Sequence, residues 1–340
     1  MSTIKDIARA SGVSYQTVSY VLNNSRPVSA KTRKRVLDAV KALNYHPNAV
    51  ARGLLKKRLN TVGVVFPYSP ASLIAHHHLG PVIDGILQVS QSRGQSIMVF
   101  TAQTYPDSPE RLSLYCDGRS DGLLVIAQPS DSDLVQALHA TRTPYVCIND
   151  CWEDAQIPCV DVDNVAAAEE MARYLVRLGH RRFALLPGPY QAVSVALRIK
   201  GFRKAMAACG IPDGDIVEMP GDYGESSGFE RGLAIAERAA RRDAPTAVFC
   251  LNDLIALGVI AALAKRGVRV PEDVSVVGFD DIVAAATTTP PLTTIRLPMR
   301  QLGERATEML LDQIEGGSPR QGKLLLETRL IERGSVLRLV

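Results

Sequence analysis

Polar side chains that can exchange hydrogen bonds lie close together near the start of the chain, at Tyr15, Gln16 and Ser19. The apolar residues among them recur at helical spacing, so these three side chains fall on the exposed face of a short predicted helix. A phenol, a carboxamide and a hydroxyl can donate to and accept from the polar edges of nucleic-acid bases. The residue types therefore indicate recognition of bases by hydrogen bonding.

The stretch from Thr3 to Leu22 supplies the elements that would position these side chains, namely two short amphipathic helices joined by a tight turn. Thr3, with Asp6 three residues later, is typical of a capping box. Gly12 can take the positive φ at which the first helix ends, and Ser14 is expected to cap the second helix. This is the helix-turn-helix arrangement, whose second helix enters the major groove of DNA. We predict a DNA-binding head, and the alternative is an unrelated small three-helix domain.

The charge of the chain is distributed unevenly. Residues 1–60 carry twelve Lys or Arg against two acidic residues, a net charge of +10, whereas the remainder carries −6. A basic head attracts phosphates without regard to base sequence and makes binding depend on salt. A third helix is expected after its cap Ser29, with the basic run 31–35 on its exposed face. The residues expected to bury this helix are Val36, Val40 and Leu43.

After residue 60, short apolar runs alternate with segments of helical length and amphipathic pattern, and the cycle restarts after Asp163. This alternation is typical of parallel sheets with right-handed crossovers. The expected fold class is therefore α/β, with a small all-α head and a core of two doubly wound parallel sheets. A ligand cleft is expected at the carboxyl ends of the strands. The runs expected to be strands are 62–66, 97–100, 123–126, 145–148, 183–186, 247–249 and 274–279.

Composition and cysteine usage exclude several classes of protein. No apolar run approaches the length of a membrane span, and the first helix is too polar for a signal peptide, so we expect a cytoplasmic protein associated with the nucleoid. The six cysteines lack CxxC spacing, which favours reduced, mostly buried thiols over a disulfide frame or a zinc site. The run His76, His77 and His78 is expected at the solvent or the rim of the cleft, because adjacent side chains diverge. No metal and no cofactor are predicted.

The sequence also argues against two other classes of function. The segment 224–228 matches the G-x-S-x-G pattern of hydrolases, but no apolar strand precedes it and all six histidines lie upstream. Ser226 or Ser227 is expected to cap the following helix instead, and no glycine-rich nucleotide loop is present. We therefore predict that the protein is not an enzyme. A sugar-binding module without DNA binding would need only the core, but a basic helix-turn-helix stands where such a protein would carry a signal peptide.

Six segments of the chain resemble the lac repressor (LacI/GalR) family of bacterial transcription regulators. They are SGVSYQTVS (11–19), HPNAVARGLL (46–55), GHRRFALLPGP (179–189), LNDLIALG (251–258), VSVVGFDD (274–281) and PPLTTI (290–295). The resemblance implies a dimeric repressor with a core like a periplasmic sugar-binding protein and with DNA affinity set by a small effector. It implies a head at 1–46, a hinge helix and linker at 47–60, and a core at 61–340. The first lobe would take about 61–162 and 294–325, and the second about 163–293 and 326–340.

The resemblance also carries over DNA contacts. Tyr15 and Gln16 match the base-reading pair of the recognition helix, but Tyr20 stands where the lac repressor has an arginine. The operator is therefore expected to differ from the lac operator at that base step. Leu54 matches the leucine of the hinge helix that enters the minor groove, although a leucine of an ordinary linker or core is the alternative. The predicted DNA-binding residues are Thr3, Ser14, Tyr15, Gln16, Thr17, Ser19, Tyr20, Asn23, Ser29, Thr32, Asn48, Ala51 and Leu54.

For the cleft, the resemblance implies effector contacts from six residues, Asn149, Trp152, Arg198, Tyr223, Asn252 and Asp280. A guanidinium, carboxylate and amides with an aromatic face suit a carbohydrate. Arg198 lies among apolar residues, where a charge needs a partner or a cleft. Competing structural roles are a helix cap for Asp280 and simple packing for Trp152.

We expect release by a sugar-like inducer and repression of carbohydrate-utilisation genes, with a purine or nucleoside corepressor as the alternative. The end of the chain lacks the leucine heptads that make the lac repressor a tetramer, so a homodimer on a pseudo-palindromic operator is expected.

Overall fold

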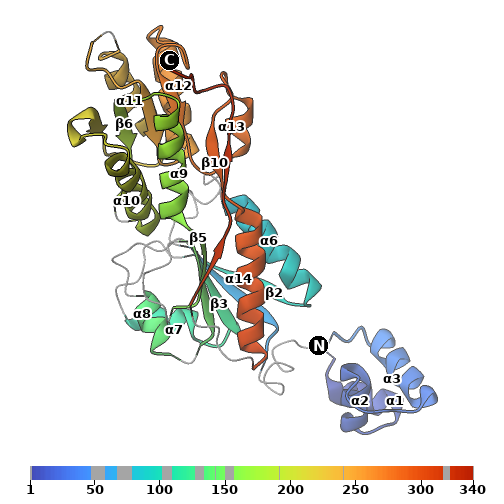
Figure 1. Ribbon diagram of the computed structural model, residues 1–340. Helices are drawn as coiled ribbons and strands as arrows, with labels where there is room; N and C mark the ends of the chain where they lie inside the picture. Colours follow the sequence, from blue (N-terminus) through green and yellow to red (C-terminus); the bar gives the residue numbers. More distant parts are fainter. Residues whose placement is uncertain are drawn as a thin grey trace. The chain divides into compact units, whose positions relative to one another are not determined.

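The computed structural model divides into two compact units, Met1–Asn60 and Thr61–Val340 (Figure 1). It describes residues 2–46, 58–66, 79–101, 109–126, 134–141, 143–149, 157–190, 192–239, 241–316 and 322–339. Within these ranges, no helix is both long and apolar enough to cross a membrane. The predicted roles of Asn48, Ala51, Leu54 and Trp152, and of the three consecutive histidines, fall outside the described residues.

The first unit contains three helices, each opened by the predicted cap. The Thr3 hydroxyl and Asp6 form a reciprocal capping box, and Gly12 ends the first helix at φ 62°. The hydroxyls of Ser14 and Ser29 accept hydrogen bonds from the backbone N–H groups three residues later, at 3.1 and 3.3 Å. The helices are α1 (Ile4–Ser11), α2 (Tyr15–Asn23) and α3 (Ala30–Ala42).

A small apolar core holds these helices together, and it consists of Ile7, Val18, Val21, Val36 and Ala39. Leu43 was expected to join this core, and that expectation is wrong, because Leu43 is 37% exposed. Helix α3 stops at Ala42, and Leu43 is its C-cap, beyond the last residue of the helix. Ala39, one helical turn earlier, fills the core position instead.

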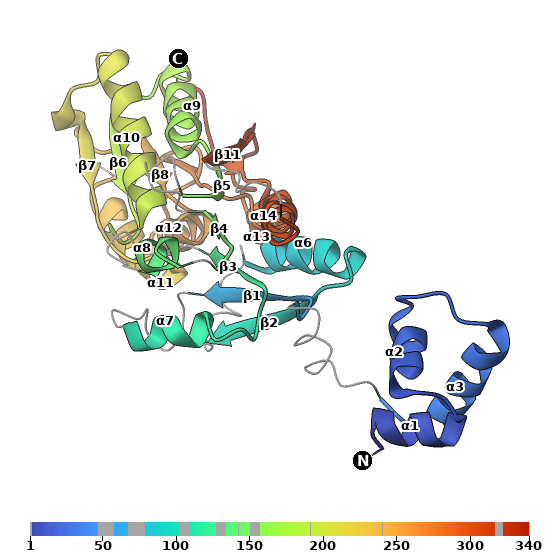
Figure 2. The same cartoon turned by 90° about the horizontal axis from the view of Figure 1, so that it is seen from below.

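The second unit contains two parallel sheets, and the first has six strands in the order β11-β5-β4-β3-β1-β2. Helices α6 and α14 pack together on one face, while α7 and α8 lie on the other (Figure 2). Neighbouring residues of β3 point to opposite faces, so Leu124 joins the core under α6 and Leu123 joins the core on the other face. The strands are β1 (Thr61–Phe66), β2 (Ser96–Thr101), β3 (Gly122–Ile126), β4 (Tyr145–Ile148), β5 (Cys159–Val162) and β11 (Lys323–Leu326), and the helices are α6 (Leu79–Ser92), α7 (Pro109–Tyr115), α8 (Leu134–His139) and α14 (Met299–Ile314).

The second sheet has four parallel strands in the order β7-β6-β8-β9. Helices α9 and α10 pack together beside it, as do α11 and α12 (Figure 1). Phe183 and Ala184, adjacent on β6, belong to different core clusters, so both faces of the sheet are buried. The strands are β6 (Phe183–Leu186), β7 (Ile216–Glu218), β8 (Ala247–Cys250) and β9 (Ser275–Val277), and the helices are α9 (Asn164–Arg177), α10 (Val193–Ala208), α11 (Glu225–Ala236), α12 (Asp253–Lys265) and α13 (Val283–Thr287), with a 3₁₀ turn at Asp213–Asp215.

Three chain segments connect the two sheets. The first runs from β5 into α9, and the other two include an antiparallel pair of short strands, β10 (Thr294–Arg296) and β12 (Arg329–Ile331). An isolated bridge between Asp280 and Arg296 joins β10 to the end of the second sheet. The predicted α/β class, with a helical head and two doubly wound parallel sheets, is confirmed.

The cysteines differ in one respect from expectation. Cys116, Cys147, Cys209 and Cys250 are free thiols, and burial raises the pKa of Cys147 to about 12. Cys159 is disulfide-bonded, so the expectation of reduced thiols is wrong for this residue. Among the described residues, no group of three or more His, Cys, Asp or Glu side chains could hold a metal ion.

Candidate functional site

Helix α2 presents the polar side chains that were predicted to read bases. Tyr15 is 58% exposed, and Gln16 beside it is also exposed. Ser19 is half-buried, and it accepts hydrogen bonds from the Asn23 amide at both its carbonyl and its hydroxyl oxygen, at 3.0 and 3.1 Å. The first turn of α2 therefore offers a phenol and a free carboxamide, while its last turn is braced internally.

The described members of the predicted DNA-binding set fall into two groups. The exposed ones are Thr3, Ser14, Tyr15, Gln16 and Ser29, and the half-buried ones are Thr17, Ser19, Tyr20, Asn23 and Thr32. Thr3, Ser14 and Ser29 serve as helix caps, so their hydroxyls are already hydrogen-bonded. At each of these three caps, a phosphate could instead bind to the positive end of the helix dipole and to the backbone N–H groups of the first helical turn.

Arg35 has a structural role that the sequence did not reveal. Its guanidinium donates to the carbonyl oxygens of Ser11 and Gly12, with an Nη2–O distance of 3.1 Å to Gly12. These carbonyls belong to the turn between α1 and α2, which fixes the angle of the recognition helix. The basic run 31–35 therefore does not form a uniform solvated face.

In the second unit, Arg198 of α10 is the centre of a buried polar cluster. Only 8% of its surface is exposed. Its Nε donates to Asn164 Oδ1 at 2.9 Å and its Nη1 to the carbonyl of Leu251 at 2.6 Å. Nη1 also lies 3.6 Å from the carboxylate of Asp280, and the guanidinium covers the ring of Phe279 at 3.8 Å.

Part of this cluster is left without protein partners. Within the described part of the chain, Arg198 Nη2 makes no hydrogen bond, and the Asp280 carboxylate has no hydrogen-bond donor beside its ion pair with Arg198. Burial raises the pKa of Asp280, and the charge of Arg198 opposes that rise. The Nη2 amino group of Arg198, a donor, and the Asp280 carboxylate, an acceptor, therefore lie side by side at a buried site.

A second buried carboxylate, Asp253, supports the cluster. It lies in the first turn of α12, where it accepts hydrogen bonds from the Thr294 hydroxyl at 2.6 Å and from the Ile282 N–H at 2.8 Å. Burial raises its pKa to about 6. Asp253 thus ties α12 to β10, one of the strands that connect the two sheets. The Cβ of any larger residue at Gly278 would lie 2.2 Å from its Oδ1, which explains the glycine.

The other described residues of the predicted effector set form no hydrogen bond or ion pair with Arg198 or Asp280. The amide of Asn252 is engaged at both ends, because its oxygen accepts from Ile255 N–H at 2.7 Å as the cap of α12 and its nitrogen donates to the Tyr223 carbonyl at 3.0 Å. The Tyr223 ring lies on the backbone of Gly188, where a Cβ would approach it to 2.5 Å. Asn149 directly follows β4 with φ 59° and has no contact with Arg198 or Asp280 among the interactions of the described residues.

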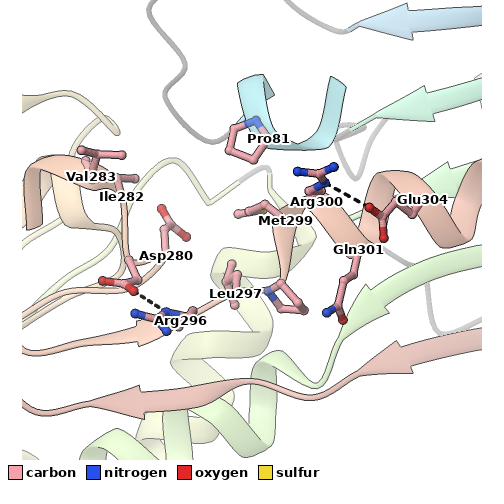
Figure 3. A pocket seen from close by; sticks show the side chains of 12 residues that line it. Pro81, Asp280, Ile282, Val283, Arg296, Leu297, Met299, Arg300, Gln301 and Glu304 are labelled. Carbon is pink, nitrogen blue, oxygen red and sulfur yellow. Dashed lines mark hydrogen bonds and ion pairs between the residues drawn. The ribbon is translucent and has the colours of Figure 1, made fainter. Parts of the chain in front are cut away.

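A cavity of about 430 Å³ adjoins the cluster, next to the connecting strands (Figure 3). Of the predicted effector residues that the structure describes, only Asp280 lines it. Ion pairs between Arg296 and Asp281 at 2.6 Å and between Arg300 and Glu304 at 3.1 Å lie in its wall. The other lining residues are Pro81, Ile282, Val283, Leu297, Pro298, Met299 and Gln301.

Sequence reasoning missed several residues of this region. Asn164, Asp253 and Phe279 each lie next to a residue that was singled out, but their function depends on partners far away in the sequence. Arg231 was also missed, although it is buried and donates to four backbone carbonyls, those of Ser227, Pro187, Met219 and Asp222. The expected cap of α11 is wrong: Gly224 is its N-cap, and the Ser227 hydroxyl accepts from Asp222 N–H.

The head and the polar cluster of the core define a class of protein, namely DNA-binding regulators with a ligand-responsive two-lobed core. Residues 3–48 match the family described as bacterial regulatory proteins, lacI family, and residues 172–336 match the periplasmic binding protein-like domain. The HTH-type transcriptional repressor PurR of Salmonella paratyphi A is 37% identical over 99% of this chain and 97% of its own. The lac repressor dimer bound to operator and the anti-inducer ONPF is 33% identical, covers 99% of both chains and has a TM-score of 0.87. The cellobiose complex of the regulator CelR is 31% identical over 98% of this chain and all of its own, with a TM-score of 0.73.

The chain belongs to the lacI family of bacterial transcription regulators. It is a DNA-binding, effector-responsive transcriptional repressor and not an enzyme.

Proposed function

We propose that the effector of this repressor is a small sugar-like molecule bound at Arg198 and Asp280, and that its binding releases the protein from the operators of carbohydrate-utilisation genes. The observation that carries the proposal is the open pair of groups in the buried cluster, the Nη2 amino group of Arg198 and the carboxylate of Asp280. Vicinal hydroxyls of a sugar can accept from the first and donate to the second at the same time.

The surroundings of this pair favour the same ligand class. Tyr223 is half-buried beside Asn252, and its aromatic face is suited to stacking on a sugar ring, whereas the Phe279 ring is fully buried beneath Arg198. The Asn252 amide is used for the cap and for the Tyr223 carbonyl, so we assign it the positioning of that loop. Asn149 and Trp152 stay in the proposed set as contacts from the first lobe. The relative CelR was solved with cellobiose, which supports a carbohydrate ligand.

On the DNA side, we propose that a homodimer reads a pseudo-palindromic operator through Tyr15, Gln16 and Tyr20, with helix N-termini at the phosphates. Residues 1–46 would form the head, 47–60 the hinge helix and linker, and 61–340 the core. The lac repressor relative was solved as a dimer on its operator, which supports this assembly. A protein that acts on the chromosome in this way works in the cytoplasm.

A purine or nucleoside corepressor is the second candidate. The planar guanidinium on Phe279 and the ring of Tyr223 would also suit a flat heterocycle, and a buried carboxyl group can pair with a ring N–H. The two candidates differ in sign, since a corepressor would strengthen operator binding and an inducer would weaken it.

A thermal-shift screen of the full-length protein tests the proposal, with mono- and disaccharides, sugar acids, phosphosugars and purines as probes. Arg198→Ala is the test variant. Arg203→Ala is the matched control, because Arg203 lies on the same helix but pairs with the surface carboxylates Asp213 and Glu218.

A sugar that raises the melting temperature of the wild type and of Arg203→Ala, but not of Arg198→Ala, is the expected result. A purine with the same pattern would replace the sugar by the second candidate. A ligand that still stabilises Arg198→Ala would contradict the proposed site.

A further inference from the structure

Tyr20 and Arg26 form a stacked pair at the end of the recognition helix. Tyr20 lies in the last turn of α2, and the Arg26 guanidinium covers its ring at 5.1 Å from the ring centre. Arg26 is exposed, whereas Tyr20 is half-buried. An exposed stack of this kind stabilises a fold only weakly, so its energy alone gives little reason for the arrangement.

The guanidinium of Arg26 has no hydrogen-bond partner in the part of the chain that the structure describes. Within the described residues, its guanidinium has no carboxylate and no carbonyl partner besides the ring contact. Other arginines of the head are occupied: Arg9 lies 3.8 Å from Asp6, Arg33 donates to Asn24 at 2.9 Å, and Arg35 donates to the turn carbonyls. Arg26 therefore presents five free N–H donors, held in a plane by the ring beneath it.

The backbone after α2 brings Arg26 back over the helix. Asn24 caps the helix in the left-handed region at φ 51°, which reverses the chain direction. The N–H of Ser25 then donates to the Tyr20 carbonyl at 3.3 Å, and Arg33 of α3 holds the Asn24 side chain. The position of Arg26 is thus fixed by the turn and by α3 as well as by Tyr20.

The stack continues the row of base-reading residues. Tyr20 follows Gln16 by four positions, so both side chains lie on the same face of α2. The free guanidinium of Arg26 extends this row by one further group. This chain has Tyr20 where the lac repressor has an arginine in the recognition helix. Arg26, in the turn that follows the helix, places a guanidinium over Tyr20 instead.

We propose that Arg26 reads a guanine in the major groove of the operator, and that Tyr20 acts as a positioning residue that holds the guanidinium plane. A planar fork of two N–H donors matches the O6 and N7 acceptors of guanine, and this pairing distinguishes a G·C pair from the other three. The proposal rests on the proposed operator binding and names one of its specificity-determining residues.

The test begins with selection of a preferred operator from a random library by the full-length protein, with and without the effector that the screen returns. Affinities are then measured for that operator and for each of its single base-pair variants. The proteins compared are the wild type, Arg26→Ala, Tyr20→Leu and Tyr20→Phe. Lys41→Ala is the control for loss of one exposed positive charge elsewhere on the head.

We expect Arg26→Ala to lose the preference for one G·C pair per half-site, by about 5- to 150-fold, while the preferences at other pairs persist. Tyr20→Leu should lose the same preference because the ring is gone, whereas Tyr20→Phe should keep it. Lys41→Ala should change all operator variants by one common factor.

Three results would overturn the proposal. If Arg26→Ala weakens every variant equally and flattens the salt dependence by about one unit per head, Arg26 binds a phosphate. If the preference survives in Arg26→Ala, the stack has no part in recognition. If it survives in Tyr20→Leu, the positioning role is wrong. Failure of the wild type to select any operator would instead contradict the proposed operator binding itself.

Discussion

At the scale of single residues, the core of this repressor is organised by charges placed where water is scarce. A buried guanidinium is tolerated because Asn164, the Leu251 carbonyl and Asp280 share it. Arginine suits this site better than lysine, because its plane can lie on the Phe279 ring while its edge serves several acceptors. Asp253 lies close by and forms no ion pair among the described residues, so its buried charge is costly as well.

This cost leads to a prediction about pH and Asp253→Asn. Asp253 has a pKa of about 6 in the folded protein, against an ordinary value near 3.8 when exposed, because burial disfavours its charge. Between these values the folded state binds more protons than the unfolded state, so stability rises as the pH falls through this window and is lost as the pH rises through 6. Asparagine can accept from Ile282 and donate to the Thr294 hydroxyl, and it does not titrate.

The free energy of unfolding should therefore rise for the wild type relative to Asp253→Asn by about 2 kcal/mol between pH 7.5 and pH 4.5. Denaturant titrations of both proteins at four pH values measure this difference. Parallel pH profiles would contradict it.

At the scale of elements, helix pairs approach each other closely where glycine replaces a side chain. A Cβ at Gly303 of α14 would lie 2.1 Å from the carbonyl oxygen of Val82 on α6, and a Cβ at Gly85 would meet the Arg300 carbonyl at the same distance. The absence of a side chain at Gly303 and at Gly85 therefore permits the close spacing of α6 and α14, which together cover one face of the first sheet.

Gly303→Ala should accordingly destabilise the protein by about 1–3 kcal/mol, since the helices must move apart to admit the methyl group. Gly80→Ala in α6 is the matched control. A Cβ there meets nothing within 4 Å, and alanine should gain up to about 1 kcal/mol of helix propensity. Chemical unfolding of the two variants provides the comparison, and equal effects would refute the close-packing explanation.

The recognition helix depends on a single long side chain from α3. Arg35→Ala removes the donors to the Ser11 and Gly12 carbonyls, and we expect a loss of about 1.5–3 kcal/mol in the local stability of the α1–α2 turn. Lys34→Ala, at an exposed neighbouring position, should have almost no effect. Amide hydrogen exchange of α1 and α2 in the full-length protein measures both. Unchanged protection in Arg35→Ala would show that the turn is held by other contacts.

At the scale of the whole molecule, three segments join the two sheets, and carboxylates near the Arg198 cluster contact these segments. Asp253 bonds β10 through Thr294, while Asp281 pairs with Arg296 and Arg333 at 2.6 Å each. A ligand at Arg198 and Asp280 therefore acts within a few bonds of the connecting strands. By linkage, any preference of the ligand for one arrangement of the lobes shifts the population of both.

Self-association is expected at exposed apolar positions of the first sheet and its helix. Val99, on the edge strand β2, is 48% exposed, and Leu87 on α6 is 49% exposed. Sedimentation at micromolar concentration should give a dimer, and Val99→Asp should shift it towards the monomer, because an unpaired carboxylate would be buried. Leu43→Asp, which charges an equally apolar exposed residue of the head, is the control. A wild-type monomer or tetramer would contradict this prediction.

Much of this protein was determined by its sequence alone, because the signals are local. The capping box at Thr3, the caps Ser14 and Ser29 and the left-handed Gly12 depend on residues within one helical turn, and each is found as predicted. The alternation of apolar runs with amphipathic segments likewise predicted two parallel sheets. Predictions from local sequence were wrong where a helix boundary lies one to three residues from the expected position. Leu43 lies just beyond the end of α3, and the N-cap of α11 is Gly224 and not Ser226 or Ser227.

Only the tertiary structure decided which polar groups meet. Arg198 finds Asn164 34 residues earlier and Leu251 53 residues later, and Arg35 reaches a turn 24 residues before it. The residues near Arg35 in the sequence do not distinguish its role from that of Lys34. The residues near Asp253 likewise do not predict its hydrogen bond with Thr294. Such pairings depend on how sheets and helices bring distant segments together, because a buried charge is stable only where the whole fold has supplied its partners.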